Sequence, residues 1–243
     1  VLLNAGRDIN QSSTVAITSG NGVLSVTAGQ NINNSGALSH GGSGSVDLSA
    51  AQDVINSGSI ASSSGKVQVL AGRNFSQSGG NVSISAPNPL ANPLYVNARG
   101  NVFISNSTIA NIAGGELHVI AGRNMTLSNN AQIIGGTLNT STNIVVDDLF
   151  PSPPNFYGRG FLTKDASSTI TGSEVRIYTA RQPWNSIASP INGFVFIPGM
   201  QYIDTTQEIW NSYFARTLEG VPFTVFYKDS PLAIIPVVPV PVP

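Results

Sequence analysis

The chain has 243 residues, of which 41% are hydrophobic and only 9% are charged, which excludes a disordered chain held open by its own charge. Eleven Lys and Arg against twelve Asp and Glu give a net charge of −1, so the basic surface typical of a nucleic-acid partner is missing. There are no Cys and two His, and no apolar run reaches the roughly 18 residues of a membrane-spanning helix, so we expect no disulfide, no metal or other cofactor and no membrane span.

Copies of one pattern, apolar-x-apolar-x-Ala-Gly-x-Asn-apolar, follow one another between residues 1 and 125. The alanines of the pattern recur at intervals of 21 to 23 residues, with one interval of 27. A period of this length is found in leucine-rich repeats and in β-helices. Within each copy apolar and polar residues alternate, as in Leu24-Ser25-Val26, which is the period of a strand. The alanines are Ala5, Ala28, Ala50, Ala71, Ala98 and Ala121.

Each copy contains three short apolar spots, which we interpret as three strands of one coil. The first precedes the Ala, the second follows the Asn of the pattern, and the third is a short pair such as Val82 and Ile84. Strands of successive coils would stack at about 4.8 Å. The sequence therefore predicts an all-β chain that forms a parallel β-helix, or β-solenoid, with about 21 to 23 residues per coil.

One column of short polar residues is predicted to form a ladder of hydrogen bonds at a corner of each coil. Asn and Asp side chains bond local backbone groups and tolerate left-handed dihedrals at such corners. The glycines beside them are expected to supply the same freedom of φ. The ladder residues are Asp8, Asn31, Asp53, Asn74, Asn101 and Asn124, and the glycines are Gly6, Gly29, Gly72 and Gly122.

Two insertions interrupt the repeat. The interval of 27 residues contains the Pro-rich stretch 86–93, and a second insertion is expected near 150–164. Degenerate copies of the pattern lie on either side of the second insertion, at 144–148 and 175–179. We therefore assign residues 1–182 to the parallel β-helix.

Residues 183–243 are interpreted as an aromatic-rich C-terminal cap or assembly segment. Residues 205–208 have the form of a capping box before apolar residues at helical spacing, which predicts one short helix at 205–220, and 221–227 predict a strand. The tail 231–243 is rich in Pro and Val, which favours an extended ribbon. The segment either shields the end of the rod or docks on a neighbouring subunit by strand addition. The candidate cap or assembly residues are Trp210, Tyr213, Phe214, Phe226, Tyr227, Ile234, Ile235 and Val238.

The charged side chains that a β-helix enzyme needs are sparse. Glu116 and His118 project from the same face of one strand and are the candidate acid and base, although a surface pair without chemistry is the favoured interpretation. In neighbouring coils the equivalent outward positions are expected at Tyr95, Val145 and Arg176. No catalytic residue is assigned.

Two further groups are considered as ligand sites. Asp147 and Asp148 offer carboxylates to calcium, but a solvated corner pair is the favoured interpretation. The arginines Arg7, Arg73 and Arg123 form one column and could bind a glycan or an acidic partner. We expect instead that they are solvated at the edge of the coils and that their aliphatic stems cover the coil below.

Two copies of the pattern carry a family resemblance. Leu-Ser-Val-Thr-Ala-Gly-Gln-Asn-Ile-Asn-Asn-Ser-Gly (24–36) and Val-Gln-Val-Leu-Ala-Gly-Arg-Asn-Phe-Ser-Gln-Ser-Gly (67–79) resemble the repeats of filamentous haemagglutinin-type exoproteins of Gram-negative bacteria, the two-partner secretion family. The resemblance covers residues 1 to about 181. It implies a right-handed parallel β-helix, export through the outer membrane, and a role in adhesion, matrix formation or contact-dependent antagonism.

Residues and resemblance together predict a non-catalytic β-solenoid that is secreted or lies on the bacterial outer surface. It would act as an adhesin segment or as the subunit of a self-assembling extracellular filament. The strand that begins at Val1 offers an unpaired edge, so a head-to-tail homo-oligomer is expected. A host or cell-surface glycan or protein is the other expected partner. The alternatives are a polysaccharide-active β-helix enzyme and a glycan-binding module with Tyr95 as a stacking residue.

Overall fold

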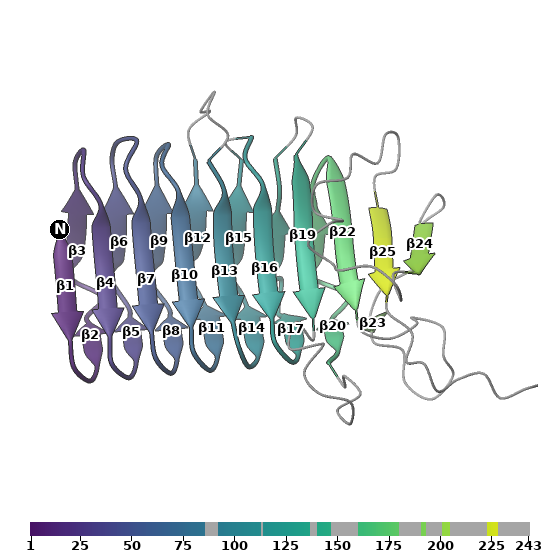
Figure 1. Cartoon of the computed structure of the whole chain (residues 1–243), viewed down its shortest axis with the longest axis horizontal. Coiled ribbons are helices and arrows are strands. Elements are labelled where there is room, and N and C mark those ends of the chain that lie inside the picture. The colour runs from purple at the N-terminus through teal and green to yellow at the C-terminus, as the bar shows by residue number, and fades with distance from the viewer. Residues whose placement is uncertain are drawn as a thin grey trace, which may run out of the picture.

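In the computed structural model the chain winds into a parallel β-solenoid with three sheets, which confirms the predicted fold class (Figure 1). The structure describes residues 1–85, 92–112, 114–136, 140–146 and 160–179, together with the backbone of 191–192, 201–204 and 223–227. Each coil adds one strand to each sheet, and the strands of neighbouring coils pair in parallel. We name the sheets A, B and C in the order in which the first coil visits them.

The strands of each sheet follow their order in the chain, except that the last two strands of sheet A lie in the reverse order. Sheet A consists of β1 (Leu2–Ala5), β4 (Leu24–Ala28), β7 (Val46–Ala50), β10 (Val67–Ala71), β13 (Leu94–Ala98), β16 (Leu117–Ala121), β19 (Ser141–Val146), β22 (Glu174–Thr179), β25 (Phe223–Tyr227) and β24 (Gln201–Asp204). Sheet B consists of β2 (Ile9–Gln11), β5 (Ile32–Asn34), β8 (Val54–Asn56), β11 (Phe75–Ser78), β14 (Val102–Ser105), β17 (Met125–Ser128), β20 (Leu162–Lys164) and β23 (Ile191–Asn192). Sheet C consists of β3 (Ala16–Ser19), β6 (Ala37–His40), β9 (Ser59–Ser62), β12 (Asn81–Ile84), β15 (Thr108–Asn111), β18 (Gln132–Ile134) and β21 (Thr169–Thr171).

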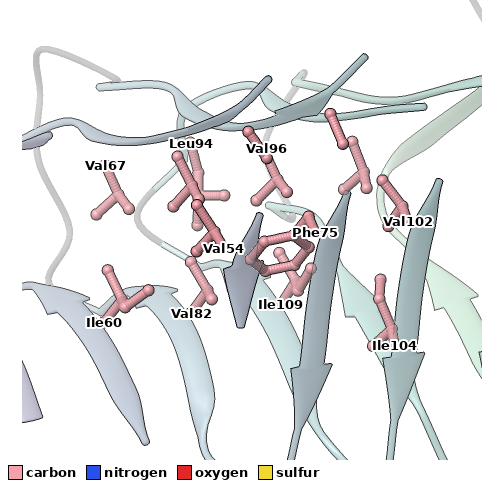
Figure 2. Packing of buried hydrophobic residues seen from close by; sticks show 14 of the residues in the cluster. Val54, Ile60, Val67, Phe75, Val82, Leu94, Val96, Val102, Ile104 and Ile109 are labelled. Carbon is pink, nitrogen blue, oxygen red and sulfur yellow. The ribbon is translucent and has the colours of Figure 1, made fainter. Parts of the chain in front are cut away.

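The core is a continuous apolar column inside the coils. The register places equivalent residues above one another, so that Ala5 pairs with Ala28 and Ala28 with Ala50. Because side chains alternate across a strand, every second residue points inward. Full burial of a Val, Leu, Ile or Phe side chain stabilises the fold by about 1.5 to 3 kcal/mol, and a coil achieves it only when neighbours cover both of its faces. Figure 2 shows inward side chains of the three sheets meeting, among them Val67, Leu94 and Val96 from sheet A, Val54, Phe75, Val102 and Ile104 from sheet B, and Ile60, Val82 and Ile109 from sheet C.

The corner glycines permit close contact between coils. The prediction of left-handed dihedrals at the corner is wrong. The described residues with positive φ include none of the ladder Asn and Asp residues and none of the glycines Gly29, Gly72 and Gly122. Instead, a Cβ on Gly29 would collide with the carbonyl oxygen of Gly6 in the preceding coil, and one on Gly122 would collide with that of Arg99. A side chain at these positions would push neighbouring coils apart.

Both interruptions leave the register of the coils intact. β12 ends at Ile84 and β13 begins at Leu94, with residues 86–91 outside the described part, yet β13 pairs with β10 over its full length. After the second interruption β20 pairs with β17, with Leu162 opposite Met125. The second insertion therefore ends before residue 162, earlier than the expected boundary at 164.

Strands from residues 183–243 extend the sheets of the solenoid. β23 pairs with β20 in sheet B, and β25 pairs with both β22 and β24 in sheet A. β25 therefore lies between β22 and β24, although it follows β24 in the sequence (Figure 1). The strand predicted at 221–227 is confirmed as β25, whereas the predicted helix at 205–220 and the tail at 231–243 lie outside the described residues. In the described part, no helix has the length and apolar character needed to cross a membrane.

Candidate functional site

The structure brings the corner residues of the predicted ladder together, coil upon coil. The backbone N–H and Nδ2 of Asn31 both donate to Oδ1 of Asp8, at 3.1 and 2.8 Å. The same contacts, at 2.9 to 3.2 Å, continue through Asp53, Asn74, Asn101 and Asn124. An Asn suits this role because its oxygen accepts from the next coil while its Nδ2 donates to the previous one. The corner ladder therefore joins neighbouring coils along one edge.

Asp53 is the carboxylate that has ladder residues in the coils on both sides, and the cationic side chain of Arg73 lies beside it. As an aspartate it has no Nδ2, so only its backbone N–H donates to Oδ1 of Asn31. The guanidinium of Arg73 donates from Nε to Oδ1 of Asp53 at 2.8 Å, and its Nη2 is ion-paired with Oδ2 of Asp53. These contacts hold the pKa of Asp53 below its usual value, against the opposing effect of partial burial. Arg73 thus compensates a charge of the ladder, and it is exposed like Arg7 and Arg123.

A second, buried ladder of amides runs through sheet B. Nδ2 of Asn34 donates to Oδ1 of Asn56 at 2.6 Å, and Nδ2 of Asn56 donates to Oε1 of Gln77 at the same distance. All three side chains are almost fully buried and occupy one inward row of β5, β8 and β11. Asn56 and Gln77 also donate to the carbonyl oxygens of Gly58 and Gly79 at the following turn. The amide ladder therefore anchors the corner between sheets B and C from inside.

Glu116 and His118 lie side by side on the outer face of sheet A. Oε2 of Glu116 is 2.9 Å from Nε2 of His118, and the ring of Tyr95 stacks on the imidazole with centroids 4.4 Å apart. The hydrogen bond with His118 lowers the pKa of Glu116, and burial together with the charge of Glu116 raises the pKa of Tyr95. A carboxylate beside an imidazole has the chemistry of a general acid and base.

The outward row that contains His118 continues differently from the expected one. The register places Asn143 opposite His118, two residues before the expected Val145. Arg176 lies opposite Asn143, as expected for this row. His118, Asn143 and Arg176 are 4%, 0% and 3% exposed, and Arg176 donates from Nε to Oε1 of Glu174 at 2.6 Å. Side chains that are this deeply buried offer little surface to a substrate, so the row is a packed polar cluster.

A tight polar turn follows β20 and connects sheets B and C. The carboxylate of Asp165 accepts from the backbone N–H of Asn129 at 2.6 Å, from the hydroxyl of Ser167 at 2.9 Å and from the backbone N–H of Ser168 at 2.8 Å. Hydrogen bonds from Ser168 and from Asn129 lower the pKa of Asp165 to about 2. Nζ of Lys164 donates to the carbonyl oxygens of Asp165 and Ser168 at 3.0 and 2.9 Å. These contacts fix the turn where the chain resumes the solenoid after the second insertion.

The inward side chains of the first coil are less buried than those of the second. β1, β2 and β3 each occupy the end of their sheet. Leu3, Ile9 and Ile17 pack against the core but are only partly buried. Their partners one coil further, Val26, Ile32 and Leu38, are each 1% exposed. A coil stacked on β1, β2 and β3 would bury Leu3, Ile9 and Ile17 in the same way.

The remaining candidates lie largely outside the described residues. Of the predicted cap or assembly residues, Phe226 and Tyr227 lie in β25, and the other six lie outside the described part. The candidate calcium pair Asp147 and Asp148 also lies outside it. Over the ranges that the structure describes, no three His, Cys, Asp or Glu side chains come close enough to hold a metal ion.

No protein family, curated protein or solved structure gives a significant match to the chain.

Proposed function

We propose that the chain is a non-catalytic structural segment of a secreted or cell-surface fibre or adhesin, and that its coils stack on further coils of the same kind. The observation that carries this proposal is the stacking of the coils, in which each strand pairs in parallel and in register with its equivalent in the next coil. A further coil stacked on β1, β2 and β3 would bury Leu3, Ile9 and Ile17, which are only partly buried against the core. Unpaired edges of parallel strands are templates for pairing with another chain. The resemblance to filamentous haemagglutinin-type repeats agrees with export.

A stacked assembly would join one end of a copy to the other end of the next. Such a head-to-tail contact is heterologous and does not close, so it produces filaments that lengthen with concentration. The corner ladder is compatible with such a contact, because a ladder residue of an added coil could accept from the backbone N–H of Asp8, as Oδ1 of Asn31 accepts from that of Asp53.

Sedimentation velocity and negative-stain electron microscopy over a range of concentrations test this proposal. We expect rods longer than a single chain, and we expect Ile17→Asp to abolish them because a charge would face the joined cores. The matched control is Asn10→Asp, an exposed outward position of the same coil whose oxygen accepts from Asn33 at 2.7 Å in the wild type. Wild-type chains that stay monomeric at every concentration would show the proposal to be wrong, and so would rods that form equally well from Ile17→Asp.

Polysaccharide cleavage is a second candidate, and the pair of Glu116 and His118 is the observation in its favour. The burial of His118 weighs against it, because a general acid or base must reach the glycosidic oxygen. Release of reducing ends from neutral and acidic polysaccharides, abolished by Glu116→Gln, would establish this activity. We expect no release.

A further inference from the structure

A shallow groove lies on the outer face of sheet B, across β14, β17 and β20. Its volume is about 460 Å³. The residues that line the groove carry no charge, since they are two phenylalanines, two asparagines and two threonines. They are Asn101, Phe103, Asn124, Thr126, Phe161 and Thr163.

The floor of the groove is one outward row of the sheet. Phe103 pairs with Thr126, and Thr126 with Thr163, so the three side chains follow one another from coil to coil at about 4.8 Å. The neighbours of Phe103 in β14, Val102 and Ile104, are buried in the core, which turns the ring of Phe103 outward. It is 43% exposed. The row thus offers one accessible aromatic face beside two hydroxyl groups.

The rim of the groove is the end of the corner ladder. Asn101 and Asn124 are its last two amides, and the next coil places Phe161 at this corner position, where its backbone N–H donates to Oδ1 of Asn124 at 3.0 Å. In the ladder, one N–H of each Nδ2 donates to the oxygen of the preceding coil. An amide nitrogen carries two N–H groups, so each Asn has a second donor that the ladder does not use. The replacement of Asn by Phe161 adds a second ring to the groove.

We propose that this groove binds a neutral oligosaccharide. An aromatic ring packs against the apolar face of a pyranose, and amide and hydroxyl groups exchange hydrogen bonds with its hydroxyls. None of the six lining side chains carries a charge that would recognise a carboxylate or a sulfate. The nearby Arg123 is exposed on the corner but is not part of the lining. This inference goes beyond the proposed scaffold, since a stacked rod would display such a groove once in every chain.

Isothermal titration calorimetry with maltohexaose, cellohexaose and laminarihexaose tests the proposal, with oligogalacturonate and a heparin hexasaccharide as charged probes. We expect at least one neutral probe to bind and Phe103→Ala to weaken that binding tenfold or more. The matched control is Ile55→Ala, because Ile55 occupies the same outward row, is 45% exposed and lies outside the groove. Ile55→Ala should bind as the wild type does.

Three results would overturn the proposal: no binding of any neutral probe, binding that survives Phe103→Ala unchanged, or binding of the charged probes alone. A Thr126→Val variant supplies a second check that leaves the ring in place and removes one hydroxyl, with an expected loss of several-fold in affinity. The titration is run at concentrations where the chain is monomeric by sedimentation, so its outcome is independent of filament formation.

Discussion

Replacing Asn56 by Leu tests how the buried amide ladder stabilises the solenoid. In this variant Oε1 of Gln77 and the carbonyl oxygen of Gly58 lose their donor, and Nδ2 of Asn34 loses an acceptor at 2.6 Å. Asn34 keeps only a long contact of 3.4 Å to the carbonyl oxygen of Ser59. A buried polar group without a partner costs about 1 to 3 kcal/mol, and the added apolar side chain recovers part of this. We expect the free energy of unfolding to fall by about 2 to 4 kcal/mol.

A triple variant, Asn34→Leu with Asn56→Leu and Gln77→Leu, separates the cost of orphaned partners from the value of the ladder itself. It removes donors and acceptors together, and the same inward row already carries Ile104 and Leu127 in the next two coils. The loss in the triple variant should therefore fall short of the sum of the three single losses by about 1 to 3 kcal/mol. Urea unfolding followed by circular dichroism measures all four variants. If the loss in the triple variant equals the sum of the three single losses, the reasoning is refuted, because additive losses indicate side chains that do not share hydrogen-bond partners.

Other substitutions probe the remaining features. Gly122→Ala should destabilise the fold by about 1 to 3 kcal/mol through overpacking between coils, whereas Gly20→Ala, which has open space around it, should leave the Tm unchanged; equal Tm values for the two variants would contradict the role given to close contact. Phe75→Ala should cost about 3 to 5 kcal/mol in urea unfolding because it empties a fully buried position. Asp165 has a folded-state pKa of about 2, below its ordinary value of 3.8, so its stabilising effect is present above pH 3.8 and is lost as the pH falls through 2. The Tm difference between the wild type and Asp165→Asn should therefore shrink on acidification, and a difference that is constant with pH would count against the contacts of this carboxylate.

The period of the repeat was sufficient to predict the fold, because the alanine column and the alternation around it locate a strand in every coil. Leu24-Ser25-Val26 is such a strand, and Ala28 pairs with Ala5 and Ala50 as the intervals require. The prediction of register failed where the pattern degenerates. The observed register pairs Leu117 of β16 with Thr142 of β19, both at inward positions. Because Thr142 is polar, the apolar alternation instead predicts that Leu117 pairs with Ile144, two residues later.

The amide ladder escaped prediction because polarity alone does not distinguish a buried amide from an exposed one. A signal was present: Gln11, Asn34, Asn56 and Gln77 each lie two residues after an apolar inward residue, and therefore on the same side of the strand. The reason for the corner glycines was also out of reach, since the contact of Gly29 with Gly6 depends on how closely successive coils approach. The groove around Phe103 requires three coils in register, which no single copy of the pattern contains.

The stacking of one coil on the next has a consequence for how the rod unfolds. Each coil is stabilised mainly by its two neighbours, so the molecule approximates a one-dimensional chain of coupled units. A unit with one neighbour opens at lower free energy than a unit with two. Amide hydrogen exchange should therefore be slowest near β10 to β15, where each coil has a neighbour on both sides.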